Sequence, residues 1–344
     1  MSAALTVDLD AFERNLRVVR DRVAPADLML VVKDDAYGHG LERIVSRAHA
    51  CGVRWIGAFD VASGVRTRAV LGADARIFVW LIAGPADARA AVAADLDLGI
   101  GDAAALEDAA AAARDAGRPA RVHLKIDTGL HRNGVRAEHW AAFVARAAVL
   151  ESEGVVEVIG IWSHIAEASD ADDDDARAVF LAAIDTAAEA GIRTPLRHLA
   201  ASAAAVARPE FRFDLVRVGA FCYGIRPAGG PSDADLGIVQ IAALDVPVTA
   251  VGADAARVGV GSADGLPSTL GGRVTVQTPA GRRALLEVDD VESAVAVWPG
   301  AAVGQTVRIT GPGAPGMTDL AESIGTIGEE IALRLSPLLP RDYR

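Results

Sequence analysis

The sequence predicts an α/β fold in which a (β/α)₈ barrel is followed by a smaller, mostly β domain. Through the first two-thirds of the 344 residues, eight short apolar or β-branched runs alternate with helix-length segments. These runs are apolar almost throughout, as strands buried on both faces of a parallel sheet are. Beyond about residue 226 the runs shorten, alternate and are punctuated by Gly and Pro, which is typical of an antiparallel domain. We therefore expect a barrel over residues 1–227 and a β domain over residues 228–344.

The barrel strands are predicted in chain order from their apolar composition. They are 28–33, 55–60, 77–82, 96–100, 121–127, 155–164, 196–202 and 215–221. The helix-length segments between them are 39–50, 61–70, 102–116, 138–153 and 174–190. An open doubly wound sheet is the alternative, but no GxGxxG motif follows the first strand. The acidic run 169–178 is interpreted as a solvated loop leading into a helix, with acids near the helix N-terminus.

The β domain follows a connector at 226–237 that is rich in Pro, Gly and Asp. Its predicted strands are 238–244, 245–251, 256–261, 273–278, 283–290 and 306–311. Residues 319–336 are predicted as one helix, a turn and a last short strand.

The composition argues against several classes of binding partner and indicates a cellular location. The net charge is −12 with a pI near 5.1, and no long basic stretch occurs, which argues against nucleic acid and anionic membrane as partners. Cys51 and Cys222 are far apart and in no metal-ligand spacing, so we expect neither a disulfide framework nor a metal site. The N-terminal residues lack a signal-peptide pattern, and no apolar run is long enough to cross a bilayer; we expect a cytoplasmic protein.

Chemically active residues stand at the carboxyl ends of the predicted strands, where barrels carry their functional groups. They are Lys33, Asp60, Lys125, Asp127, His164, Ser202, Arg217 and Gly219. Partial burial makes a lysine amine a better nucleophile toward an aldehyde, which is the chemistry that attaches pyridoxal 5'-phosphate (PLP) to a protein. Taken alone, Lys33 could equally be a strand-end lysine whose amine reaches solvent. His123 and His198 are expected to be core histidines rather than catalysts.

Three motifs add a family resemblance. VVKDDAYGHG (31–40) resembles the PLP-lysine motif of alanine racemases, in which Ala-Asn usually occupies the places of Asp34 and Asp35. HLKIDTGLHRNGV (123–135) resembles the second motif of that family. FDLVRVGAFCYG (213–224) resembles its eighth-strand motif, with Val218 where proline is usual. The resemblance is clear over residues 3–228 and extends more loosely to the two-domain layout.

The resemblance implies a PLP site. Lys33 would hold the cofactor covalently and act as one of two bases. The phosphate would be bound by Tyr37, Ser202 and the backbone N–H groups of Gly219 and Ala220, where small residues allow a close approach.

Other roles follow from the same resemblance. Arg217 would face the pyridine nitrogen and, because it keeps its proton, would weaken the electron sink and limit side reactions. His164 would pack beside the ring and bond Arg217. Arg132 would reach the cofactor's phenolic oxygen and the substrate carboxylate, which makes Lys33, Arg132 and His164 the predicted catalytic residues. Lys125 matches a position that is carbamylated in some members. Ala201 stands where asparagine is usual.

The second domain departs from the family pattern. The second base of alanine racemases is a tyrosine supplied by the partner subunit, yet here 248–251 runs almost directly into 252–265, and the tyrosine segment is missing. Ser262 replaces a further tyrosine, the usual Met-Asp pair is absent, and Pro337 or a neighbour stands where a phosphate-binding tyrosine is common. A water molecule or a carboxylate would have to substitute; the candidates are Asp264, Asp289 and Asp290.

The predicted function is a PLP-dependent amino-acid racemase, most simply alanine racemase, working as a homodimer on a small-molecule amino acid. Loss of one positioned base typically lowers a rate by about 10²–10⁴. The alternatives are another PLP reaction on the same barrel, such as racemisation of a different amino acid, β-elimination or retro-aldol cleavage, and a non-catalytic PLP-binding paralogue.

Overall fold

The computed structural model describes residues 3–193 and 196–344, which form two compact units. The barrel unit comprises residues 20–33 and 45–219. The β unit comprises the residues up to Val19, residues 34–44 and residues 220–344. Within the described residues, no helix is both long enough and apolar enough to span a membrane.

Eight parallel strands form the barrel, and all eight predicted strands are confirmed. They are β2 (Asp27–Val31), β3 (Trp55–Asp60), β4 (Arg76–Leu81), β5 (Asp97–Ile100), β6 (Ala120–Lys125), β7 (Val156–Trp162), β8 (Leu196–His198) and β9 (Leu215–Val218). Each strand from β2 to β7 pairs with the next along the chain, and β9 returns to pair with β2. Backbone hydrogen bonds from Asp214 N to Arg197 O (3.1 Å) and from Arg217 N to Ala200 O (3.1 Å) join the last two strands. The parallel ring is therefore nearly closed.

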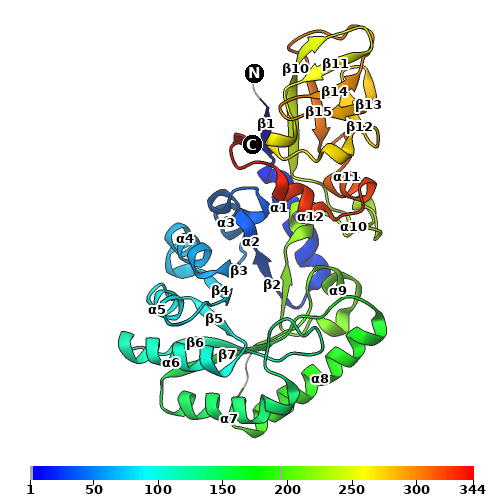
Figure 1. The fold of residues 1–344 in the computed structure, drawn as a ribbon. Coiled ribbons are helices and arrows are strands. Elements are labelled where there is room, and N and C mark those ends of the chain that lie inside the picture. Colours follow the sequence, from blue (N-terminus) through cyan, green and yellow to red (C-terminus); the bar gives the residue numbers. More distant parts are fainter. Residues whose placement is uncertain (1–2, 194–195) are drawn as a thin grey trace. The chain divides into compact units, whose positions relative to one another are not determined.

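Helices follow most of these strands and lie outside them (Figure 1). They are α4 (Val61–Leu71), α5 (Pro85–Ala93), α6 (Ala103–Ala116), α7 (Ala137–Ser152), α8 (Asp170–Glu189) and α9 (Ser202–Ala207). Asp60, Asp102 and Ser169 cap the N-termini of α4, α6 and α8 with their side chains. Because Ser169 is the cap, the acidic run lies in the first turns of α8. The predicted acids near the helix N-terminus are confirmed, and the predicted loop at 169–173 is wrong. Helix α5 was not predicted.

Large aromatic rings fill the barrel interior. Met29, Trp55, Phe78, Trp162 and Leu215 form one buried cluster. Glycines on neighbouring strands make the space for them; a Cβ on Gly99 would lie 2.9 Å from the Phe78 ring. The interior is thus a packed core, and the open positions for chemistry are at the strand ends.

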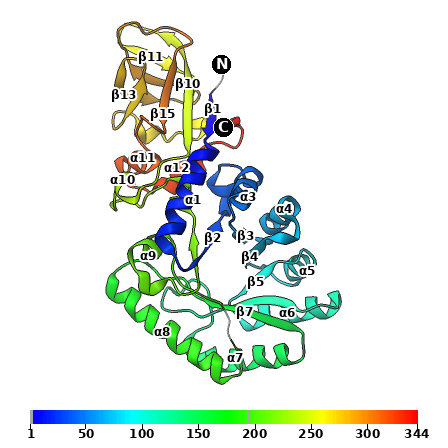
Figure 2. The same ribbon diagram turned by 180° about the vertical axis from the view of Figure 1, so that it is seen from behind.

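The β unit is built on a second eight-stranded sheet (Figure 2). Its strands are β1 (Ala4–Val7), β10 (Ala242–Val251), β11 (Ala255–Val258), β12 (Thr275–Thr278), β13 (Gly281–Val288), β14 (Ser293–Ala296), β15 (Thr306–Thr310) and β16 (Arg341–Tyr343). Most pairs are antiparallel, whereas β1 and β16 pair in parallel. Strand β10 also pairs with β11. The N-terminal strand therefore belongs to the sheet of the C-terminal residues.

Several details of the β unit differ from prediction. Residues 242–251 form one strand, not parts of two, and β14 was not predicted. Residues 319–336 contain parts of two helices, α11 (Met317–Ser323) and α12 (Gly328–Arg334), so the predicted final strand in that range is wrong. Gly325 has a φ of 75°, which separates the two helices. The remaining helices are α1 (Leu9–Val23), α2 (Lys33–Tyr37), α3 (Leu41–Ala50) and α10 (Asp233–Leu236).

Candidate active site

Lys33 lies two residues beyond the carboxyl end of β2 and opens a left-handed turn, α2. Asp34, Asp35, Ala36 and Tyr37 have φ values of 52°, 55°, 56° and 54°. Consecutive L-residues rarely adopt this conformation, which costs roughly 1–2 kcal/mol per residue relative to the right-handed one. The chain therefore stores strain directly behind the predicted cofactor lysine, as functional sites commonly do.

The aspartate pair suits this turn. Asp and Asn enter the left-handed region more easily than most residues because their short polar side chains bond locally. Asp35 Oδ1 accepts a hydrogen bond from the backbone N–H of Leu41 (3.2 Å), at the start of α3. The carbonyls of Asp34 and Asp35 accept from the N–H groups of Gly38 (2.9 Å) and Gly40 (3.0 Å). The Asp-Asp pair is thus compatible with the left-handed turn that this chain adopts.

Arg217 is the most constrained residue of the barrel site. It is only 5% exposed, and its guanidinium donates to the carbonyls of Ser163 (2.7 Å), His198 (2.9 Å) and Leu199 (3.0 Å). Its Nη2 lies 3.2 Å from His164 Nδ1. Burial lowers the pKa of Arg217 to about 9, an effect that Glu167 opposes, so the guanidinium stays charged at neutral pH.

Positive charge surrounds His164. Burial, reinforced by Arg217, Arg132, Lys125 and Lys33, lowers the pKa of His164 to about 3, so its ring is neutral at physiological pH. Burial followed by the charge of Arg217 also lowers the pKa of Lys125 to about 8. The Lys125 amine donates to Asn133 Oδ1 (3.2 Å) and lies 4.4 Å from the centre of the Trp162 ring.

Ser202 and Gly219 meet at the predicted phosphate end. The Gly219 N–H donates to Ser202 Oγ (3.3 Å), which joins the start of α9 to the end of β9. Ala201 offers no side-chain cap to α9, and Glu167 Oε1 accepts from the Ala204 N–H (2.9 Å). A carboxylate from the segment after β7 therefore caps this helix, for which Ala201 has no side-chain acceptor.

Tyr37 and Ala220 belong to the β unit. A hydrogen bond from the Ala220 backbone acts on the Tyr37 hydroxyl, and the Tyr37 ring packs 4.8 Å from that of Tyr223. Burial, followed by the negative charge of Glu329, raises the pKa of the Tyr37 phenol well above its usual range. Tyr37 is therefore a neutral hydroxyl that can donate a hydrogen bond.

Arg132 is the exposed member of the predicted set. It lies in the segment between β6 and α7, where Asp127 accepts from the N–H groups of Gly129 (3.0 Å) and His131 (3.0 Å). Its charge acts on His164, Lys125 and Arg217, which places it at the same end of the barrel.

The three carboxylates proposed to replace the second base, Asp264, Asp289 and Asp290, differ in the hydrogen bonds that hold them in place. Residues 252–254 alone connect β10 to β11, where the Gly252 N–H donates to Ala255 O (2.8 Å). Asp264 accepts from the Gly261 N–H (3.0 Å), and Asp289 pairs with Arg257 (2.8 Å). Asp290 has a longer contact with Ser262 Oγ (3.4 Å). Of the three, Asp290 is the least tied to a structural partner.

Two contacts were missed from the sequence. Asn133 was part of a quoted motif but received no role, and Glu167 had no signal beyond its place after a strand. Both reach residues from other elements, and only the fold shows those partners.

The barrel residues fit PLP. A half-buried lysine follows β2, a charged and buried arginine lies beside a neutral histidine, and the Ser202 hydroxyl lies beside a backbone N–H at the end of β9. Lys33 would hold the cofactor covalently, Arg217 would face its pyridine nitrogen, and Ser202 with Gly219 would bind its phosphate.

Comparison with known proteins agrees with this fold. Residues 7–227 match the family model for the alanine racemase N-terminal domain. The chain is 35% identical to an alanine racemase of Beutenbergia cavernae, with 98% of this chain and 97% of that protein aligned. It is 36% identical to an alanine racemase of Frankia casuarinae, with 100% and 96% aligned. The first alignment spans 370 positions against 344 residues here, so that relative has segments without a counterpart.

Solved structures give the same result. The crystal structure of alanine racemase from Streptomyces lavendulae superposes with a TM-score of 0.94 at 32% identity, covering 100% of this chain and 97% of that one. Alanine racemase from Streptomyces coelicolor superposes with a TM-score of 0.93 at 32% identity, covering 99% and 98%. The chain therefore belongs to the alanine racemase family, with a barrel followed by a β domain.

Proposed function

We propose that this chain is a PLP-dependent amino-acid racemase, most simply one that acts on alanine. The observation that carries the proposal is Arg217, a buried and charged guanidinium held beside the neutral His164 on a barrel that also carries Lys33. The relatives named alanine racemase, aligned over nearly the whole chain, support it.

PLP, when bound, supplies the electron sink that acidifies the α-hydrogen of an amino acid. Lys33 would hold the cofactor covalently and, when its Nζ is free of the cofactor, would accept or return a proton on one face of the substrate. Arg217 donates a hydrogen bond to the pyridine nitrogen, and because it stays charged it gives up no proton there. Ser202 and the backbone N–H of Gly219 would bind the phosphate, a role that the family resemblance also gives to Tyr37 and the backbone N–H of Ala220.

Substrate selection rests on charge. Lys33, Lys125, Arg132 and Arg217 all act on the ring of His164, so its surroundings are positive, although the carboxylates of Asp127 and Glu167 act on Lys125 and Arg217 at the same end. Such a field favours an anionic ligand, and an amino acid brings a carboxylate. We assign the carboxylate to Arg132, the exposed arginine of the set.

The face of the substrate opposite Lys33 lacks the tyrosine base that the family resemblance implies. The short 252–254 connection supports the loss of the segment that carries the tyrosine in relatives. We propose that water or Asp290 acts in its place, and that racemisation is slow. We retain the expectations of a cytoplasmic homodimer in which the partner subunit completes each site.

The test is a panel of D- and L-amino acids offered to purified, PLP-loaded protein, followed by circular dichroism, with Lys33→Ala as the blank. We expect alanine turnover at least ~10²-fold below a typical kcat of about 10 s⁻¹. Ordinary turnover would show that another residue replaces the tyrosine. No reaction with any amino acid, from a protein that binds PLP, would refute the proposed function.

A further inference from the structure

A buried chain of polar side chains crosses the barrel from Arg217 to its opposite end. Arg217 Nη1 lies 3.2 Å from His198 Nδ1, and His198 Nε2 lies 2.9 Å from His123 Nδ1. His123 Nε2 lies 3.5 Å from Asp97 Oδ2, a long contact for a hydrogen bond. His198, His123 and Asp97 are all 0% exposed.

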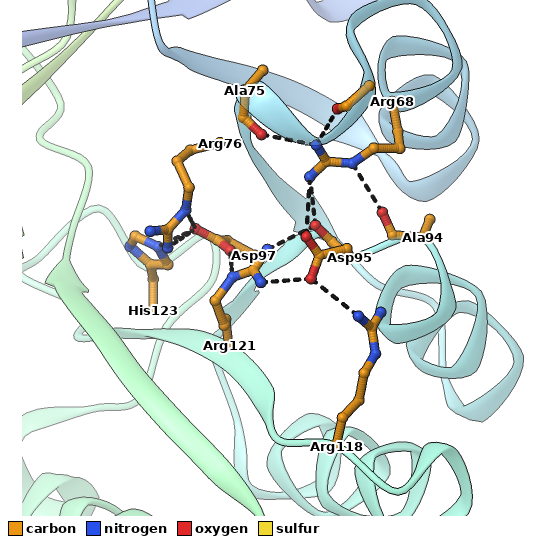
Figure 3. Close-up of polar contacts among 10 residues, drawn as sticks. Arg68, Ala75, Arg76, Ala94, Asp95, Asp97, Arg118, Arg121 and His123 are labelled. Atoms are coloured by element: carbon orange, nitrogen blue, oxygen red, sulfur yellow. Dashed lines mark hydrogen bonds and ion pairs between the residues drawn. The ribbon is translucent and has the colours of Figure 1, made fainter.

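Asp97 lies where β5 begins, among basic side chains (Figure 3). Arg76 donates to Asp97 Oδ2 from Nη2 (2.7 Å) and Nε (3.1 Å), and Arg121 Nε donates to Oδ1. Burial alone would raise the pKa of Asp97, but His123, Arg76 and Arg121 together lower it to about 2. Asp97 is therefore a charged acceptor at neutral pH.

Arg217 and Asp97, at the two ends of this row of polar side chains, determine which ring nitrogen carries the proton in His198 and in His123. An arginine can only donate, so His198 Nδ1 accepts and its proton lies on Nε2. That proton is donated to His123 Nδ1, which leaves the proton of His123 on Nε2, facing the carboxylate of Asp97. Burial lowers the pKa of both histidines, which keeps the rings neutral and this order intact.

A glycine makes the histidine pair possible. His123 is on β6 and His198 is on β8, with β7 between them in the sheet. Gly160 of β7 is the neighbour of His123, and a Cβ there would lie 2.4 Å from His123 Nδ1. The absence of a side chain at Gly160 thus leaves room for the contact between His123 and His198.

We propose that His123 and Asp97 are positioning residues that fix the tautomer of His198 and so hold the Arg217 guanidinium toward the cofactor's pyridine nitrogen. This inference rests on the proposed function for the role of Arg217. The proton order itself is a property of the protein without cofactor. The hydrogen-bond network would then connect Asp97, at the amino end of the barrel strands, to Arg217, at the end that carries the predicted cofactor site.

The matched pair of variants is Asp97→Asn and Asp95→Asn. Asp95 lies in the same arginine cluster, bonding Arg121 (2.6 Å) and Arg118 (3.2 Å), and its contacts are made with arginines rather than with His123. In Asp97→Asn the new amide could donate as well as accept, so the proton order would be set from the Arg217 end alone. Asp97→Asn should weaken PLP binding roughly tenfold at pH 7, as the loss of an outer-shell partner does, with Asp95→Asn within about twofold of wild type.

A second measurement does not depend on the folding of Asp97→Asn. Histidine ¹⁵N NMR of the wild-type protein, free of cofactor, should show the Nε2–H tautomer for both rings, with His123→Asn and His198→Asn used for assignment. Nδ1–H on His198, or equal PLP affinities for the Asp97 and Asp95 variants, would overturn the inference. Failure of the wild-type protein to bind PLP would instead refute the proposed function and leave the proton order testable.

Discussion

Lowering the pH from 7 to 5 should destabilise the protein through its buried neutral histidines, and His39 is the clearest case. Its ring is 1% exposed, donates from Nδ1 to Ala36 O (3.0 Å) and stacks on Tyr223. Burial is the main cause that lowers the pKa of His39 to about 4. The unfolded chain regains an ordinary histidine, with a pKa of about 6.5.

The sign follows from proton uptake. Between pH 6.5 and 4 the unfolded state binds a proton that the folded state does not, so the free energy of unfolding falls as the pH falls. At pH 5 the unfolded histidine is favoured about thirtyfold by protonation, which corresponds to about 2 kcal/mol for His39 alone. His164, with a pKa lowered to about 3, acts in the same direction.

Urea unfolding at pH 7 and pH 5 measures the effect, and His39→Asn isolates it. Asparagine can keep the donor to Ala36 O but cannot take up a proton, so the variant should lose about 2 kcal/mol of the pH-dependent change. The matched control is His139→Gln, because His139 is exposed. Equal pH dependence in wild type and His39→Asn would refute the reasoning.

Three further outcomes are expected. Borohydride should fix PLP on Lys33, seen as a modified peptide by mass mapping, and an adduct on Lys125 instead would contradict the assignment. Arg217→Glu should weaken PLP binding and alter its absorbance spectrum; an unchanged spectrum would place Arg217 away from the pyridine nitrogen. Gly40→Ala should lower the free energy of unfolding, measured in urea, by about 2–3 kcal/mol. The φ of Gly40 is 92°, and the new Cβ would lie 1.9 Å from the Tyr343 hydroxyl, which donates a hydrogen bond to His39 O. A decrease of less than about 1 kcal/mol would contradict this packing.

The barrel could be predicted because its information is local. Each strand is a short apolar run with a helix-length segment after it, and parallel strands need no exposed face. The strand β1 was missed because distant residues determine it. The strand β1 forms because Leu5 meets Leu244 and Arg341, and no pattern within residues 4–7 announces those partners.

For the candidate site, too, features with a local sequence signal were predicted, and those that depend on distant residues were not. Lys33 and Arg217 were predicted as site residues from motifs at strand ends, and Ser202 from its place at a strand end. The left-handed turn after Lys33 was not predicted, because its sequence gives only residue types that tolerate such a conformation. His123 and His198 were correctly expected in the core. Their contact with one another joins residues 75 positions apart, and it depends on Gly160, which looks like an ordinary strand glycine.

The pairing of β1 with both β10 and β16 has a consequence for synthesis on the ribosome. The barrel strands are joined by local crossovers, so their unit can assemble as residues up to Gly219 emerge. Strand β1 is made first, yet its antiparallel partner β10 begins at Ala242 and its parallel partner ends at Tyr343. The first strand therefore stays unpaired until β10 has been made, and its second edge until β16 has been made at the end of the chain. A strand with unpaired edges is where nascent-chain aggregation starts.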